Sequence, residues 1–167
     1  MKPYFKEEQR MTQWWLWLPL IAFLLFPLYG LYQQAVVGKP FGDNPMSNLG
    51  LVIVFFVMAG LLWFFRSIKL ITEIEGDEFR MKFKPFMIKK TIKFQEISNA
   101  EIVNYGFVGY GIRWVGGKYG TVYNTAGRYG LFVQYGKGRK FVIGTQRKEE
   151  LGRVISKILS GPAEIGS

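Results

Sequence analysis

Residues 69–84 read KLITEIEGDEFRMKFK, and this stretch decides the fold of the second part of the chain. Its later half alternates apolar with basic residues, which are Phe79, Met81 and Phe83 against Arg80, Lys82 and Lys84. Because successive side chains of a β-strand point to opposite faces, the alternation predicts a strand with one dry and one wet face. Lys69–Glu75 precedes this strand across Gly76-Asp77, a typical hairpin turn. The stretch therefore predicts an antiparallel β-hairpin.

The sequence beyond this hairpin predicts further short strands, with Gly or Pro at several of their boundaries. We expect them at Ile88–Phe94, Asn99–Asn104, Lys118–Thr125, Leu131–Tyr135 and Lys140–Gly144, which with the hairpin makes seven strands. A curled antiparallel sheet of this size leaves one open end that needs a cover.

The last segment has the spacing of an amphipathic helix. Its apolar residues are Leu151, Val154, Ile155, Ile158 and Leu159. Thr145 can cap its start, and the early Glu149 and Glu150 suit the positive end of the helix dipole. Gly161-Pro162 ends it. The sequence thus predicts a mainly β domain, a barrel or sandwich of seven strands capped by a C-terminal helix.

Two uncharged apolar runs lie upstream of the β region. The first, Trp14–Tyr32, has 19 residues, and at ~1.5 Å per residue it reaches ~28 Å, close to the hydrocarbon thickness of a bilayer. The second, Leu49–Phe65, has 17 residues, near the lower limit of about 17–25 for a membrane span. The connection at residues 38–47 is rich in Gly, Pro, Asn and Asp, which suits a turn between antiparallel helices. The sequence therefore predicts a membrane α-hairpin.

This pattern divides the chain into two parts. Residues 1–66 comprise an N-terminal tail and two transmembrane helices, at about residues 13–35 and 48–65, and residues 67–167 form the β domain. A cleaved signal peptide is the alternative for the first run. Its apolar region would be shorter, about 7–15 residues, and an A-x-A-like site would follow, but no clear site does.

The basic residues around these runs predict the orientation of the hairpin. Three precede the first run, one lies in the connection and five soon follow the second run: Lys2, Lys6 and Arg10, then Lys39, then Arg66, Lys69, Arg80, Lys82 and Lys84. Cytoplasmic flanks of membrane spans carry an excess of Lys and Arg. We therefore expect a multi-pass integral membrane protein with both termini in the cytoplasm.

Composition excludes most catalytic chemistry. The chain has no His and no Cys, and its net charge is +10. It therefore has no thiol nucleophile, no disulfide and no His-based metal, haem or relay site. The acidic group at Glu73–Glu78 lacks EF-hand spacing, and neither apolar run contains a charged residue for transport. We expect a protein that is not an enzyme and needs neither a metal nor a cofactor.

Three short motifs accompany this architecture. They are Gly111-Ile112-Arg113, Tyr123-Asn124-x-x-Gly127, and Gly144-Thr145-Gln146-Arg147 followed by Glu149-Glu150-Leu151. With them the chain resembles uncharacterised bacterial membrane proteins that have two spans followed by a bacterial pleckstrin-homology-like (PH-like) domain. The resemblance implies a PH-like fold and a bacterial inner-membrane location, and it implies no ligand.

The strand that ends at Lys84 and the strand that begins at Ile88 flank a short turn, and this second β-hairpin contains the first candidate site. Its apolar tip, Phe86 and Met87, is flanked by six cations: Arg80, Lys82, Lys84, Lys89, Lys90 and Lys93. Lys and Arg next to a membrane attract anionic lipids, so these eight residues form a candidate lipid-binding site. The alternative is an ordinary solvated hairpin whose Lys residues discourage edge pairing. Few aromatic rings accompany the cations, which disfavours nucleic acid.

The second candidate site is the Gly-rich connection at residues 105–117. Tyr110, Arg113, Trp114 and nearby Tyr119 could form a partner-binding surface of rings and one cation. In the alternative, these rings close the barrel and Arg113 pairs with Glu101. The connection contains neither of the phosphate-binding glycine motifs.

These observations predict a membrane-anchored binding or scaffold module that docks protein or anionic lipid partners at the cytoplasmic face. A structural homo-oligomeric membrane subunit without a separate ligand is the alternative.

Overall fold

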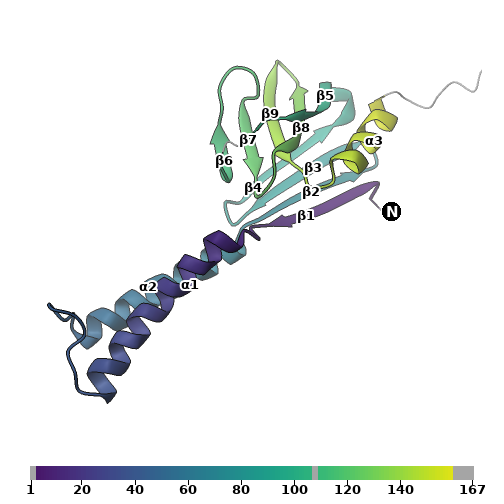
Figure 1. Ribbon diagram of the computed structural model, residues 1–167. Coiled ribbons are helices and arrows are strands. Elements are labelled where there is room, and N and C mark those ends of the chain that lie inside the picture. The colour runs from purple at the N-terminus through teal and green to yellow at the C-terminus, as the bar shows by residue number, and fades with distance from the viewer. Residues whose placement is uncertain (1–2, 107–108, 160–167) are drawn as a thin grey trace, which may run out of the picture. The chain divides into compact units, whose positions relative to one another are not determined.

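The computed structural model describes residues 3–106 and 109–159 (Figure 1). The chain forms two compact units. One is the helical segment Thr12–Ser67, and the other combines Met1–Met11 with Ile68–Ser167. We call the second the β unit.

The helical unit is a hairpin of two helices, α1 (Trp14–Leu31) and α2 (Asn48–Ser67). A π-helical turn, Tyr32–Val36, extends α1. Both helices are long and apolar enough to cross a membrane, because neither contains a charged residue apart from Arg66 in the last turn of α2. They lie close to the two predicted spans.

The connection between the helices folds back onto α1. Phe41 packs edge-on against Phe26 and Tyr29, with ring centroids 5.0 and 5.7 Å apart. Gly30 allows this approach, since a Cβ there would lie 2.8 Å from the Phe41 ring. Leu51 of α2 contacts the same position and is buried.

The first sheet of the β unit has four antiparallel strands in the order β1-β2-β3-β4. They are β1 (Phe5–Arg10), β2 (Lys69–Glu75), β3 (Glu78–Lys84) and β4 (Ile88–Lys93). Strands β2 and β3 form the predicted hairpin around Gly76-Asp77, and Glu75 pairs with Glu78 across this turn. The first strand corrects the expected division of the chain, because part of the predicted tail belongs to the β unit.

The second sheet has five strands in the order β5-β8-β9-β7-β6. They are β5 (Ile97–Asn104), β6 (Gly111–Trp114), β7 (Thr121–Asn124), β8 (Tyr129–Tyr135) and β9 (Arg139–Gly144). Of the strand pairs that the structure describes in this sheet, β7 and β9 alone are parallel. The described residues thus form nine strands in two sheets that do not close into a barrel, which corrects the expectation of seven strands and a possible barrel.

Helix α3 (Lys148–Leu159) follows the last strand and contacts β1, β5 and β8. Leu151 and Ile155 on its apolar face are buried, as predicted. The core between the sheets is built from alternate residues of the strands, among them Leu70, Phe79, Met81, Phe83, Val133 and Phe141, all without exposed surface.

Candidate functional site

At one end of the first sheet lie the residues that directly precede and follow the helical segment in the sequence. Arg10 at the end of β1 pairs with Lys69 at the start of β2, and Lys69 pairs with Lys84 at the end of β3. The turn 85–87 that joins β3 to β4 follows directly. Helix α1 begins four residues after Arg10, and α2 ends two residues before Lys69. We call this part of the sheet, with its turn, the basic end.

Basic residues dominate the outer face of the basic end. Lys82, Lys84 and Lys89 lie on this face, where Lys82 pairs in register with Lys89. Among the described residues, none of these three lysines forms an ion pair. The basic end therefore has three cations without an acidic partner.

Two further cations at this end share one carboxylate. Arg10 and Lys69 lie 2.8 and 3.1 Å from Glu8 Oε1. Hydrogen bonds from Arg10 and then Lys69 lower the pKa of Glu8, so this exposed carboxyl group remains ionised. A single acid cannot neutralise both neighbours, and the cluster keeps a positive charge.

The turn at the basic end is apolar. Met87 is 87% exposed and Phe86 is 43% exposed. The Phe86 ring stacks on the buried Phe83 ring, with centroids 5.3 Å apart. The turn thus combines an anchored ring with a projecting thioether side chain beside the cations.

The opposite end of the outer face is neutralised by acids. Arg80 forms ion pairs with Glu75 at 2.9 Å and Glu78 at 2.7 Å. The carboxylate of Glu78 is the main reason that the pKa of Arg80 is raised. Lys93 pairs in register with Glu78, so it also belongs to this opposite end. Arg80 and Lys93 are therefore not part of the basic end.

Lys90 points to the other face of the sheet. It shares the inward phase of Ile88 and Ile92. Its ammonium group lies 4.7 Å from the centroid of Phe141 and 5.5 Å from that of Tyr123, a cation–π arrangement. Of the six predicted cations, the structure brings together Lys82, Lys84 and Lys89 with Phe86 and Met87. Arg10 and Lys69 join them, and sequence reasoning missed these two as site residues.

The second predicted site centres on β6 rather than on a long connection. Trp114 is 82% exposed and Arg113 is also exposed. The Arg113 guanidinium lies beside Gly109, where a Cβ would meet its Nη2 at 3.1 Å. Within the described residues no ion pair joins Arg113 to Glu101. Residues 107 and 108 of the predicted connection lie outside the described residues.

The other two predicted residues of this site are more enclosed. Tyr119 packs against the core, with its ring centroid 6.2 Å from that of Phe132, and Tyr110 is half-buried. Asn124 fixes the incoming loop, because its amide donates to the Gly109 carbonyl at 2.8 Å and to the Tyr105 hydroxyl at 3.3 Å. Burial raises the pKa of Tyr105, which remains protonated. Only Arg113 and Trp114 are exposed enough to contact a partner directly.

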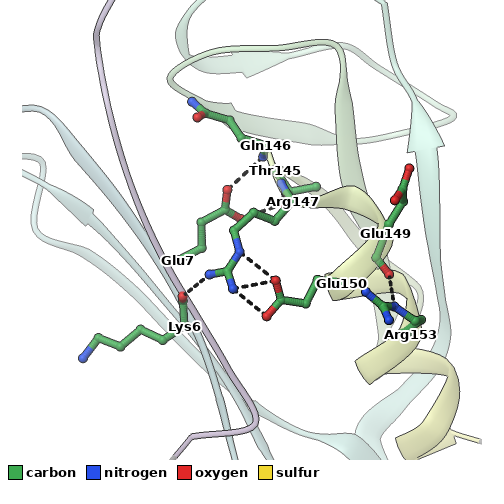
Figure 2. Close-up of polar contacts among 8 residues, drawn as sticks. All are labelled: Lys6, Glu7, Thr145, Gln146, Arg147, Glu149, Glu150 and Arg153. Atoms are coloured by element: carbon green, nitrogen blue, oxygen red, sulfur yellow. Dashed lines mark hydrogen bonds and ion pairs between the residues drawn. The ribbon is translucent and has the colours of Figure 1, made fainter.

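A polar junction joins β1 to the start of α3 (Figure 2). Glu7 is buried, and its carboxylate accepts hydrogen bonds from the Thr145 hydroxyl at 2.6 Å and the Gln146 backbone N–H at 2.8 Å. The Arg147 guanidinium donates to the Lys6 carbonyl at 2.8 Å. Two residues along β1, the Gln9 amide donates to the Gly144 carbonyl at 2.6 Å. These contacts hold strand and helix together, and sequence reasoning missed all of them.

Replacing Glu7 with Ala is expected to destabilise the β unit by about 1–3 kcal/mol, because the buried Thr145 hydroxyl and the part-buried Gln146 N–H lose their acceptor. Equilibrium urea unfolding followed by circular dichroism measures the change. Glu8→Ala on the outward face of β1 is the matched control and should cost no more than about 1 kcal/mol. Equal effects of the two substitutions would show that the junction contributes nothing specific.

Comparison of the chain with protein-family models and with curated proteins finds no match. Within the described residues, no three potential metal-binding side chains come together. The chemistry of the basic end, cations around an exposed apolar turn, is suited to binding an anionic surface with an apolar interior.

Proposed function

We propose that the chain is a membrane-anchored, PH-like binding module whose basic end contacts anionic lipids of the leaflet next to it. The observation that carries this proposal is the coincidence of three features at one end of the first sheet. The unneutralised lysines lie there, the apolar turn lies there, and both connections to the apolar helices leave from there. We also propose that the module docks protein partners.

The pairing of β1 with β2 supports the expected topology. Strand β1 precedes the first predicted span and β2 follows the second, yet six residue pairs join them in register. This pairing supports a topology in which both flanks of the hairpin lie on one side of the membrane. The excess of basic residues on these flanks favours the cytoplasmic side, which for the bacterial proteins that the chain resembles is the inner face of the cell membrane.

The electrostatic free energy favours contact between the basic end and an anionic leaflet. Each Lys or Arg near an anionic leaflet contributes about 1 kcal/mol, so Lys82, Lys84 and Lys89 together supply about 3 kcal/mol, a factor of about one hundred in the docking equilibrium. The covalent connection to the helices already confines the domain near the surface, which reduces the entropy lost on docking. Insertion of Met87 adds apolar burial.

A probe at the turn tests this proposal in the full-length protein. The chain has no cysteine, so Met87→Cys can be labelled uniquely with a dye sensitive to polarity. In vesicles that contain phosphatidylglycerol we expect a blue shift of the dye relative to vesicles of phosphatidylcholine alone. The shift should weaken as salt rises, because exposed charges are screened over about 8 Å at physiological ionic strength.

Two triple variants provide the matched comparison. Replacing Lys82, Lys84 and Lys89 with Gln should abolish the blue shift. Replacing Lys137, Arg139 and Lys140 with Gln removes the same charge from the β8–β9 turn and the start of β9 and should leave the shift unchanged. A dye signal that is the same in both kinds of vesicle at low salt would rule out lipid contact by the basic end.

A further inference from the structure

The second sheet ends in β6, and no strand within residues 3–106 and 109–159 lies beside the outer edge of β6. Among the strands that the structure describes, β7 is the only hydrogen-bonded neighbour of β6. Figure 1 shows β6 at the side of the sheet away from α3. Such an edge can pair with an extended segment of another chain.

The hydrogen-bond pattern identifies which groups of β6 face outward. The Val115 backbone N–H donates to the Gly120 carbonyl at 2.9 Å, across the hairpin to β7. In an antiparallel ladder only alternate residues bond to the partner strand. By this alternation Arg113 faces β7, and the N–H and C=O groups of Ile112 and Trp114 point to the free edge.

The side chains of this edge only partly protect it against pairing with another chain. Natural edges are blunted by short strands and charged residues, and β6 has four residues, including Arg113. Its flanks, however, are apolar and exposed, since Trp114 is 82%, Val115 41% and Ile112 38% exposed. Exposed indole and aliphatic groups next to free backbone groups are suited to binding an extended chain.

The charge of the residues around β6 indicates which kind of extended segment would bind to it. Residues 102–148 contain no acidic residue, whereas they contain eight basic ones: Arg113, Lys118, Arg128, Lys137, Arg139, Lys140, Arg147 and Lys148. A second copy pairing through its own β6 would oppose like charges, which is unfavourable. An acidic segment would be complementary. We propose that β6 accepts an extended, acidic segment of a partner protein as an added strand.

The observations on β6 are independent of those at the basic end. The test of strand addition therefore excludes anionic lipid, so that binding of the basic end to lipid does not contribute. The full-length protein is placed in bilayer discs of phosphatidylcholine, where no anionic lipid competes. The probe is a short peptide that alternates Glu with Val, and the matched peptide alternates Lys with Val. Saturating acidic peptide should slow hydrogen exchange of the amides of Ile112 and Trp114 by about tenfold or more, and the basic peptide should not.

Variants at one position separate backbone pairing from ring contact. Trp114→Pro removes a backbone N–H that the sheet does not use, which edge strands tolerate, and it should abolish protection at Ile112. Trp114→Thr keeps that N–H and should retain part of it. Arg113→Glu should abolish protection through charge, whereas Lys137→Glu in the β8–β9 turn, which does not belong to the edge strand, should not.

Several outcomes would overturn the proposal. They are an absence of protection with the acidic peptide, equal protection by both peptides, and protection that survives both Trp114→Pro and Arg113→Glu. Protection by oligodeoxythymidine in place of the peptide would assign the edge to nucleic acid, and a peptide-independent dimer with β6 protected would assign it to a second copy. The Gln triple variant at Lys82, Lys84 and Lys89 should retain peptide protection, so the failure of lipid contact and of strand addition can be told apart.

Discussion

Removal of the first ten residues is expected to unfold the β unit. The loss includes Phe5, 2% exposed in the core, and truncation of a buried Phe alone costs about 3–5 kcal/mol. It also includes Glu7 and Gln9, which satisfy groups at Gly144, Thr145 and Gln146, and it exposes the edge of β2. Together these losses reach the total stability of a typical domain, about 5–15 kcal/mol.

A water-soluble chain provides the measurement. Arg10 and Lys69 are neighbours in the sheet, so a short Gly-Ser linker can join residues 1–11 directly to residues 68–159. This joined chain should melt cooperatively, and residues 68–159 alone should not. Lys6→Ala on the exposed face of β1 is the control and should melt like its parent. Cooperative melting of both chains at one temperature would show that β1 is dispensable.

The second large effect is expected at α3. Ile155 is 3% exposed on the face of the helix that packs on the sheets. Ile155→Asp would bury a carboxylate beside apolar side chains without a partner, so it should cost several kcal/mol and unfold a marginally stable domain. Thermal melting of the joined chain measures this loss.

The neighbouring Ser156→Asp is the matched control, since Ser156 is exposed on the same helix. It should change the melting temperature little. A variant with Ile155→Asp that melts like the parent would contradict the role of α3 as a cover for the sheets.

Regular patterns in the sequence predicted the elements whose buried faces are apolar. The hairpin β2–β3, the face of α3 and the two apolar helices all lie where the spacing of apolar residues indicates. Strand β1 has the same alternation of buried and exposed residues, but two of its three buried side chains, Glu7 and Gln9, are polar. Their burial is possible because residues 116 to 139 positions later in the chain supply their hydrogen-bond partners, and no local pattern contains that information.

The candidate sites were predicted only in part for a similar reason. The lysines of β3 and β4 look alike in sequence, and the register across four strands decides which of them face an acid. Arg80 and Lys93 lie beside Glu78, whereas Lys82 and Lys84 lie beyond the acids. The inward direction of the Lys90 side chain could have been predicted, because Lys90 alternates in phase with Ile88 and Ile92. It was missed because lysine is usually exposed.

The place of β1 at the start of the chain also has a consequence for biosynthesis. A ribosome makes β1 before either apolar helix, yet Gln9 bonds to Gly144, 135 residues later. At about 5–20 residues per second, β1 waits on the order of ten seconds for these contacts, and if the helical hairpin inserts into a bilayer as proposed, it can do so during this time. During that interval the backbone of β1 can already pair with β2, but the Glu7 and Gln9 side chains still lack their partners at residues 144–146, and a partly folded β unit is open to aggregation. A nascent chain stalled before Gly144 would therefore leave the inner face of β1 uncovered, and chaperones or proteases that recognise incompletely folded domains could act on it.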